Sequence, residues 1–142
     1  MSQPHIAVEA RHDFSGDEIA ALEDRFDEFN GNQTGHRDAR QLGFEIKADD
    51  ELIGAVAGWT WAGIGELRQV WVKDSFRGKG LGTLLLCLAI NEARGRGCSH
   101  LFVATYSFQA PDFYQRFGFE TVAVIEDRPP GHRDFIMRLT LQ

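Results

Sequence analysis

A short stretch in the middle of the chain decides the fold. Residues 70–82 read Val70-Trp71-Val72-Lys73-Asp74-Ser75-Phe76-Arg77-Gly78-Lys79-Gly80-Leu81-Gly82. An apolar strand, a turn and three alternating glycines lead directly into the apolar run 81–90, and this order predicts a strand, a loop and a helix. The first N–H groups of that helix would be free, and the helix dipole is positive at this end. The stretch therefore predicts an anion site that suits a phosphate or a pyrophosphate.

Two common phosphate-binding loops do not match this spacing. A Walker loop requires Ser or Thr after its lysine, but Gly80 follows Lys79. A dinucleotide-binding loop requires a third glycine where Thr83 stands, although Gly78 and Gly80 match its start. What remains is the pattern R-G-x-G-x-G between an apolar strand and an apolar helix.

This pattern resembles the acetyl-coenzyme A loop of the GNAT superfamily of N-acetyltransferases, which reads Q/R-x-x-G-x-G/A. Arg77, Gly80 and Gly82 occupy its specified positions. A second stretch, residues 110–119, resembles the later family signature A-x-x-x-Y-x-K/R-x-G-F and places Tyr114 at its tyrosine. The two motifs occur in the family's order, and the resemblance extends over residues 51–141.

The resemblance implies an α+β fold, in which helices flank a central, mostly antiparallel sheet and one parallel pair of strands splays at a β-bulge. The length suits a single domain over residues 1–142. The sequence itself carries a sign of the bulge, because the apolar face lies on odd positions at Leu67 and on even positions at Val70 and Val72. Such a change of face predicts a bulge near Gln69. In the family, the thioester arm of the cofactor lies in the resulting gap.

Hydrophobic periodicity divides the rest of the chain into elements. We expect strands at residues 6–11, 44–48, 52–61, 66–73, 100–105, 119–125 and 135–141, and helices at residues 80–94 and 109–117. The strands on either side of the helix at 80–94 are expected to be parallel, and the last two strands antiparallel.

The N-terminal third matches the family only in its general layout. Ser15 and Glu18 form a capping box that predicts a helix from about Gly16 to residues 30–32. The stripe expected to be buried on this helix consists of Ile19, Leu22, Phe26 and Phe29. GNAT proteins usually carry a second helix next, but residues 33–40 are polar and predict a short turn or a mobile loop.

Composition limits the classes of molecule that the protein is expected to bind and the compartment in which it is expected. The formal net charge is −6, which argues against nucleic acid as a partner. The apolar runs are too short to cross a membrane, and residues 1–5 lack a signal segment, so a cytoplasmic protein is expected. No cluster of metal-ligating residues is evident, so we expect no metal cofactor. Cys87 and Cys98 are expected to be buried, reduced thiols.

The resemblance implies a set of contacts to acetyl-coenzyme A. The pyrophosphate would be held by the loop residues Arg77, Gly78, Lys79, Gly80, Leu81 and Gly82. The strand residues Val70, Trp71 and Val72 would follow the pantetheine arm, with backbone hydrogen bonds from Val70 and Val72. Ser107 stands where the family commonly has an asparagine that contacts this arm, and Gln109 is a nearby substitute.

Acyl transfer to an amine also needs a proton donor for the leaving thiolate and a base for the amine. The resemblance places Tyr114 beside the cofactor sulfur, and the pKa of a tyrosine keeps its proton at neutral pH. Glu66 is the candidate base, because many family members carry a carboxylate on this strand. Weaker alternatives are the carboxylate Glu45, the histidines His36 and His132, and no dedicated base at all. Trp59 and Trp61 share one strand face and either line an acceptor pocket or pack in the core.

The leading hypothesis is an N-acetyltransferase that moves an acetyl group from acetyl-coenzyme A to a primary amine by direct attack in a ternary complex. The acceptor, either a small molecule or a protein amine, is not specified by the sequence. The alternative is an acetyl-coenzyme A-binding sensor without turnover. A toxin that acetylates charged transfer RNA is disfavoured by the acidic balance. Homodimerisation through the C-terminal strands stays open.

Overall fold

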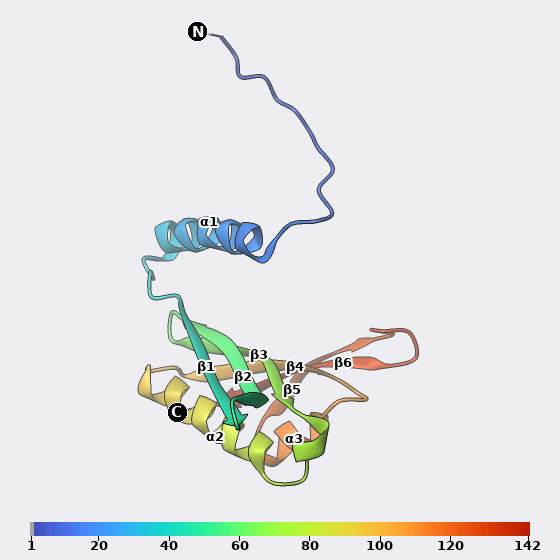
Figure 1. The fold of residues 1–142 in the computed structure, drawn as a ribbon. Helices are drawn as coiled ribbons and strands as arrows, with labels where there is room; N and C mark the ends of the chain where they lie inside the picture. The colour runs from blue at the N-terminus through green and yellow to red at the C-terminus, as the bar shows by residue number, and fades with distance from the viewer. Residues whose placement is uncertain (1) are drawn as a thin grey trace. The chain divides into compact units, whose positions relative to one another are not determined.

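The computed structural model describes residues 2–142 and divides the chain into two compact units, Met1–Arg37 and Asp38–Gln142. The first unit contains one helix, α1 (Gly16–Thr34) (Figure 1). The second unit contains all the strands, which are β1 (Arg40–Ala48), β2 (Glu51–Trp61), β3 (Ile64–Val72), β4 (His100–Tyr106), β5 (Glu120–Glu126) and β6 (Arg133–Thr140). Its helical segments are η1 (Asp74–Phe76), α2 (Leu81–Gly95) and α3 (Pro111–Arg116).

The start of the first unit differs from the expectation. The strand predicted at residues 6–11 is wrong, because residues 2–11 have no regular structure. Ile6 is 83% exposed and Val8 is 95% exposed. A strand is stable only when a neighbour takes its backbone hydrogen bonds, and the described sheet begins at β1.

The capping box of α1 is confirmed. The Glu18 N–H donates to the Ser15 hydroxyl at 3.1 Å, and the Ser15 N–H donates to the Glu18 carboxylate at 3.2 Å. Arg11 binds the same carboxylate at 2.8 Å, and this hydrogen bond is the main reason that the pKa of Glu18 is lowered. The predicted end at residues 30–32 is wrong, because the helix continues to Gly35, which ends it with a φ of +78°.

The burial expected for the apolar stripe of α1 is not found. The exposed fractions are 42% for Ile19, 36% for Leu22, 67% for Phe26 and 60% for Phe29. The described part of the first unit contains no second helix or strand against which α1 could pack. Periodicity therefore predicted which residues share one face of the helix, but not whether another element buries that face. Residues 35–39 then form a loop, which confirms that no second helix precedes β1.

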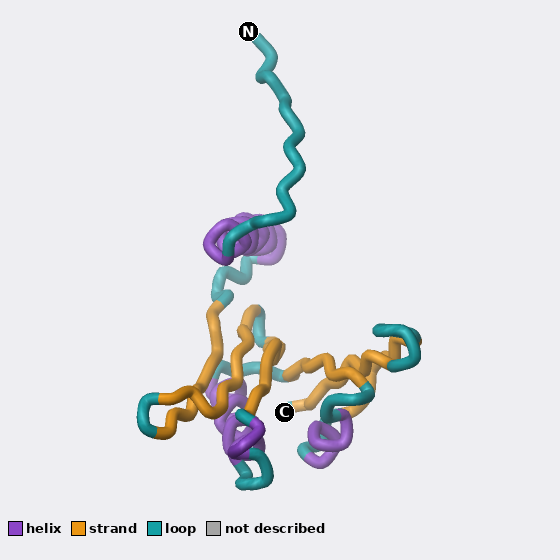
Figure 2. The backbone as a smooth tube through the Cα atoms, turned by 45° about the vertical axis from the view of Figure 1, so that its right-hand side comes forward, coloured by secondary structure: helices purple, strands orange, loops and turns teal. Residues whose placement is uncertain are grey.

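The second unit is built on a six-stranded sheet with the order β1-β2-β3-β4-β6-β5. Only β3 and β4 are parallel, because α2 connects them, and all other neighbours are antiparallel. Figure 2 shows α2 and α3 on the same side of this sheet. The α+β fold with one parallel pair, predicted from the sequence, is therefore confirmed.

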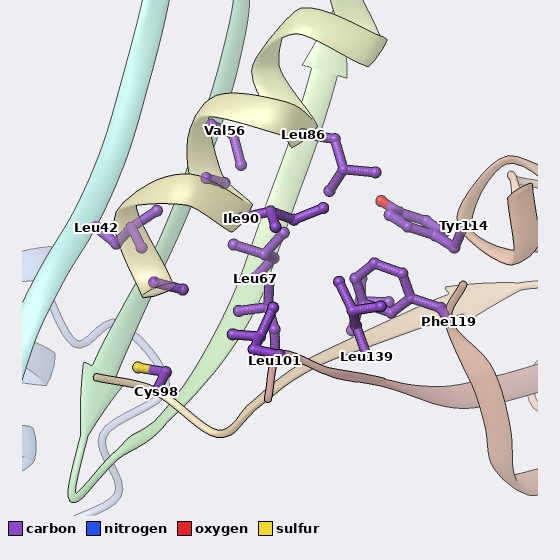
Figure 3. Packing of buried hydrophobic residues seen from close by; sticks show 14 of the residues in the cluster. Leu42, Val56, Leu67, Leu86, Ile90, Cys98, Leu101, Tyr114, Phe119 and Leu139 are labelled. Atoms are coloured by element: carbon purple, nitrogen blue, oxygen red, sulfur yellow. The ribbon is translucent and has the colours of Figure 1, made fainter. Parts of the chain in front are cut away.

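The core lies between the sheet and these two helices. Leu85, Leu86 and Ala89 of α2 are fully buried against strand residues such as Leu101 and Met137 (Figure 3). Burial of each leucine side chain stabilises the fold by about 2 kcal/mol, because it removes apolar surface from water. This packing fixes the start of α2 next to the end of β3, which is where the glycine-rich loop lies.

The two cysteines differ. Cys98 is buried as expected, and its burial raises the pKa of its thiol. The prediction for Cys87 is wrong, because this thiol is exposed. Leu84, one turn earlier on α2, is also 47% exposed, so this helix has one uncovered face although its sequence is apolar on most sides.

Candidate active site

The predicted bulge is present on β3. Ala57 of β2 pairs with Gln69 and Gly58 pairs with Leu67, so Arg68 is the extra residue on β3. Gly58 is required at this point, because a Cβ atom there would lie 2.0 Å from the Glu66 carbonyl oxygen. The bulge therefore depends on a glycine on the neighbouring strand.

The parallel pair of strands separates at the bulge. Residues 64–67 of β3 pair with residues 100–103 of β4, and no further pairs between these two strands occur within residues 2–142. A cleft of about 810 Å³ opens where they part. Both strands, the loop at residues 76–80, the start of α2 and the segment 108–116 line this cleft.

The cleft has wall residues from both faces of the sheet. Val70 and Val72 of β3, with Val103 of β4, belong to the helix-covered side, where they pack against the core. Side chains alternate along a strand, so Trp71 and Ala104 project from the opposite side. Residues from the helix-covered side and residues from the opposite side both line the cleft.

Unpaired backbone N–H groups lie at the helix-covered end of the cleft. Gly78 and Gly80 have φ values of +76° and +81°, and a Cβ atom on either would meet no described atom within 4 Å. Within residues 2–142, the N–H groups of Gly78, Lys79 and Gly80 donate to no carbonyl oxygen. The first N–H groups of α2 lack helical partners by geometry. The Arg77 N–H is different, since it donates to the Asp74 carbonyl at 3.2 Å.

The charges at the cleft are positive although the chain is acidic. Arg68, Arg77 and Arg116 line it, whereas no aspartate, glutamate or histidine of the described chain does. The Arg77 side chain lies 3.2 Å from the Asp74 carboxylate and 66% of it is exposed, so solvent screens this pair. Lys79 does not line the cleft, and its ammonium group lies 5.1 Å from the centre of the Phe76 ring.

Tyr114 lines the cleft from α3. Only 6% of the residue is exposed, and its ring makes edge contacts with Phe113 at 5.3 Å and Phe119 at 5.5 Å. Figure 3 shows its hydroxyl end pointing toward α2, near Leu86. Burial raises the pKa of Tyr114 to about 12, since the phenolate would be poorly solvated there. The hydroxyl therefore keeps its proton at neutral pH.

Most of the residues predicted for the site come together. Those on the cleft wall are Val70, Trp71, Val72, Arg77, Gly78, Gly80, Leu81, Gly82, Gln109 and Tyr114. Three predicted residues, Lys79, Ser107 and Glu66, do not line it. The Ser107 hydroxyl accepts a hydrogen bond from the Arg133 N–H at 3.1 Å, and the Glu66 carboxylate lies 3.9 Å from Arg68.

The weaker candidates also lie off the wall. Glu45 is exposed on β1 next to Lys47, at 3.4 Å, and His132 packs against the ring of Phe108. Trp59 and Trp61 are half-buried on β2. His36 belongs to the first unit. The described cleft wall therefore contains neither His132 nor the pair Trp59 and Trp61.

Sequence reasoning missed several lining residues. Arg116 could have been found, because it fills the basic position of the second motif. Arg68 follows from the bulge, which exposes the extra residue. Phe108 lies in the loop after β4 and belongs to neither motif, so no signal in the sequence pointed to it.

Comparisons with known proteins agree with the class of protein that this geometry defines, an acyltransferase whose cleft opens at a β-bulge beside a glycine-rich helix start. The model of the acetyltransferase (GNAT) family matches residues 6–119. The chain belongs to this family of N-acetyltransferases, as the two motifs implied.

Two curated relatives and one solved structure are similar to the chain. Blasticidin-S acetyltransferase of Streptomyces morookaense is 45% identical over 57% of this chain and 60% of that protein. The chain thus spans less than two thirds of the length of that relative. An acetyltransferase of Agrobacterium fabrum is 32% identical over 72% of this chain and 75% of that protein. The crystal structure of an acetyltransferase from Bacillus cereus has a TM-score of 0.76 at 23% identity, over 94% and 98% of the two chains.

One further property concerns the helices. None that the structure describes between residues 2 and 142 combines the length and the apolar character needed to span a bilayer.

Proposed function

We propose that this chain transfers an acetyl group from acetyl-coenzyme A to a primary amine, by direct attack while both are bound. One observation carries the proposal. The cleft at the Arg68 bulge has wall residues from both faces of the sheet, and it borders the loop in which the N–H groups of residues 78–80 are unpaired. Such a cleft gives the donor and the acceptor separate entrances to one point, and placing two reactants together is a large part of catalysis.

The residues present fit the cofactor. The pyrophosphate would take the N–H groups of Gly78, Lys79 and Gly80 and of the first turn of α2, where the helix dipole favours an anion. The backbone groups of Val70 and the N–H of Val72 that face β4 have no strand partner in the described sheet, so they would be available to the pantetheine amides. The Val72 carbonyl already accepts a long hydrogen bond from Arg77 Nε, at 3.4 Å. Gln109 lines the same cleft, although its side-chain oxygen accepts from the Tyr106 N–H at 2.9 Å. When bound, acetyl-coenzyme A supplies the thioester that the amine attacks.

Two groups of the chain would act on the reacting atoms. A backbone N–H at the bulge, beside Arg68 and Gln69, would stabilise the negative charge that develops on the acetyl oxygen. The Tyr114 hydroxyl would give its proton to the departing sulfur. Its raised pKa ensures that the proton is present at all physiological pH values.

The base is a separate question, because no carboxylate of residues 2–142 lines the cleft. We propose that Glu66 accepts the amine proton through water, since 36% of its side chain is exposed and it lies two residues before the bulge. The variant Glu66→Gln, compared with Glu45→Gln on β1, tests this role. A loss of about tenfold in kcat that is confined to Glu66→Gln and is relieved at higher pH supports it. Equal rates in both variants would contradict it.

The name of blasticidin-S acetyltransferase gives that relative a small-molecule substrate. We propose that this chain also acts on a small-molecule amine, without proposing that the amine is the same compound. The test is release of free thiol from acetyl-coenzyme A in the presence of a panel of primary amines, together with calorimetric measurement of acetyl-coenzyme A binding. Saturable binding and amine-dependent thiol release are expected, and absence of binding at millimolar concentration would contradict the proposal.

A sensor that binds acetyl-coenzyme A without turnover is the second candidate. It is favoured by the lack of a carboxylate or histidine on the described cleft wall and by the Ser107 hydroxyl, which already accepts a hydrogen bond within the protein. Binding of acetyl-coenzyme A without thiol release for any amine would support this second function over the first.

A further inference from the structure

Two large aromatic side chains are exposed on the walls of the cleft. Phe108, just after β4, is 57% exposed, and Trp71 of β3 is 44% exposed. The two residues belong to opposite walls, because β3 and β4 form the two sides of the cleft. Exposed aromatic surface beside a cleft is a common mark of a ligand-binding site.

These rings lie on the side of the second unit's sheet that α2 and α3 leave open. Trp71 alternates with the core-facing Val70 and Val72, so it projects from the open face. Phe108 stacks on Tyr106, which alternates in the same way with the buried Thr105. The glycine loop, by contrast, leads into α2 on the helix-covered side. The aromatic walls therefore face the entrance that acetyl-coenzyme A does not need.

Phe108 is held in place despite its exposure. Its ring lies 5.4 Å from that of Tyr106 at an angle of 18°, which is a stacked arrangement. The ring of His132, from the loop between β5 and β6, meets it at 4.8 Å and 76°, which is an edge contact. Two neighbours thus fix the orientation of Phe108, and fixing a ring before binding lowers the entropy cost of receiving a ligand.

The charges on the walls limit the kind of amine. Arg68 lines the cleft at the bulge, and no acidic side chain among the described residues does. The Glu66 carboxylate that lies 3.9 Å from Arg68 does not line the cleft, so the described wall offers no carboxylate to a second positive charge, which disfavours a polycationic acceptor. A flat, uncharged ring, by contrast, suits both Trp71 and Phe108.

We propose that the acceptor is a primary amine that carries a flat aromatic ring and no second positive charge, with the ring packed against Phe108. This inference rests on the proposed function, because it names the substrate class of the same site. Stacking against one positioned ring is expected to favour a flat ring over a puckered one of similar size by about fivefold in kcat/KM.

The experiment compares amines that differ in one property. Phenethylamine and cyclohexylethylamine have the same length, but only the first has a flat ring, hexylamine has no ring, and spermidine is a polycation. Thiol release gives kcat and KM for each amine. Ligand-observed NMR on the protein saturated with coenzyme A gives their relative binding without requiring turnover. Phenethylamine is expected to have the lowest KM and the strongest binding.

Variants locate the preference. Phe108→Leu keeps an apolar side chain without a ring and is expected to abolish the preference for phenethylamine over cyclohexylethylamine, mainly through KM. Phe108→Tyr retains the ring and is expected to retain the preference. Val122→Ala is the control within the same unit. Val122 is an apolar residue that is 52% exposed on β5 and does not line the cleft, so this variant is expected to leave all values unchanged.

The outcomes separate this inference from the function on which it rests. Failure of acetyl-coenzyme A to bind the unaltered protein would remove the proposed function. Intact cofactor binding with equal treatment of phenethylamine and cyclohexylethylamine, in turnover and in NMR, would overturn the ring preference alone. A preference that persists in Phe108→Leu, or efficient turnover of spermidine in place of the ringed amine, would also overturn it.

Discussion

The strands β3 and β4 are paired on one side of the bulge and separated on the other. Before it, residues 64–67 pair with residues 100–103, and Leu67 and Leu101 are buried in the core. After it, Val70 and Val72 have lost that partner, and their backbone groups face a cleft. The difference shows that the strand pair ends, and a cleft begins, where one extra residue, Arg68, is accommodated in β3.

The largest effect is expected where the bulge is set. In Gly58→Ala, the added Cβ would lie 2.0 Å from the Glu66 carbonyl oxygen, so β2 and β3 must move apart. We expect a loss of about 3 kcal/mol in the free energy of unfolding, as for other severe overpacking, and loss of acetyl-coenzyme A binding. Urea denaturation and calorimetry measure the two effects.

Gly95→Ala is the control for Gly58→Ala. Gly95 ends α2, and a Cβ atom there would meet no described atom within 4 Å. This variant is expected to be neutral or to gain about 0.5 kcal/mol, because alanine has less freedom to lose on folding. If both variants were equally stable and bound the cofactor, the bulge would not depend on Gly58.

The next effect concerns Tyr114, which faces the cleft beyond the bulge. Tyr114→Phe keeps the buried ring but removes the proposed proton donor, so kcat is expected to fall by about a hundredfold, with a much smaller change in the affinity for acetyl-coenzyme A. Steady-state kinetics and calorimetry check the two parts. An unchanged kcat at all pH values would show that another group protonates the sulfur.

Tyr114 also predicts a pH dependence of stability. Its pKa in the folded protein is about 12, above the ordinary value of 10.0, because burial disfavours the phenolate. The folded state therefore holds this proton more tightly than the unfolded state, and the resulting stabilisation is complete below about pH 10 and is lost as the pH rises toward about 12. Urea midpoints across this range should fall less steeply in Tyr114→Phe than in the unaltered chain.

The smallest effects compare two glycines of the loop. Gly80 has a φ of +81°, so Gly80→Ala is strained by about 1–2 kcal/mol and is expected to weaken cofactor binding by about tenfold. Gly82 lies inside α2, and a Cβ atom there would meet Phe113 at an ordinary 3.6 Å. Gly82→Ala is therefore expected to change affinity by less than about threefold. Equal losses in the two variants, measured by calorimetry, would contradict this distinction.

The sequence allowed much of the second unit to be predicted. The glycine pattern located the loop, and the change of apolar face at Leu67 and Val70 located the bulge, because both are local consequences of backbone geometry. The position of Tyr114 followed from the second motif. In each case the deciding residues are neighbours in the sequence.

The errors share another cause, which is dependence on distant partners. The stripe with Phe26 and Phe29 is apolar at helical spacing, but periodicity cannot say whether another element covers it. The run at residues 6–11 alternates without a strand to pair with. Phe108 could not be identified as a cleft residue from the sequence, because its contacts with Tyr106 and His132 appear only in the folded chain. Glu66 and Lys79 do not line the cleft, and their roles stay predictions.

The central claim is that unpaired main-chain N–H groups after the bulge hold the cofactor. Backbone amide NMR during a titration with coenzyme A tests it most directly. The account predicts that the largest shifts fall on the amides of Gly78, Lys79 and Gly80 and on Val70 and Val72, and that the amide of Cys87, on the exposed face of α2, hardly moves. Shifts that avoid residues 70–82, or a titration without saturable change, would contradict it.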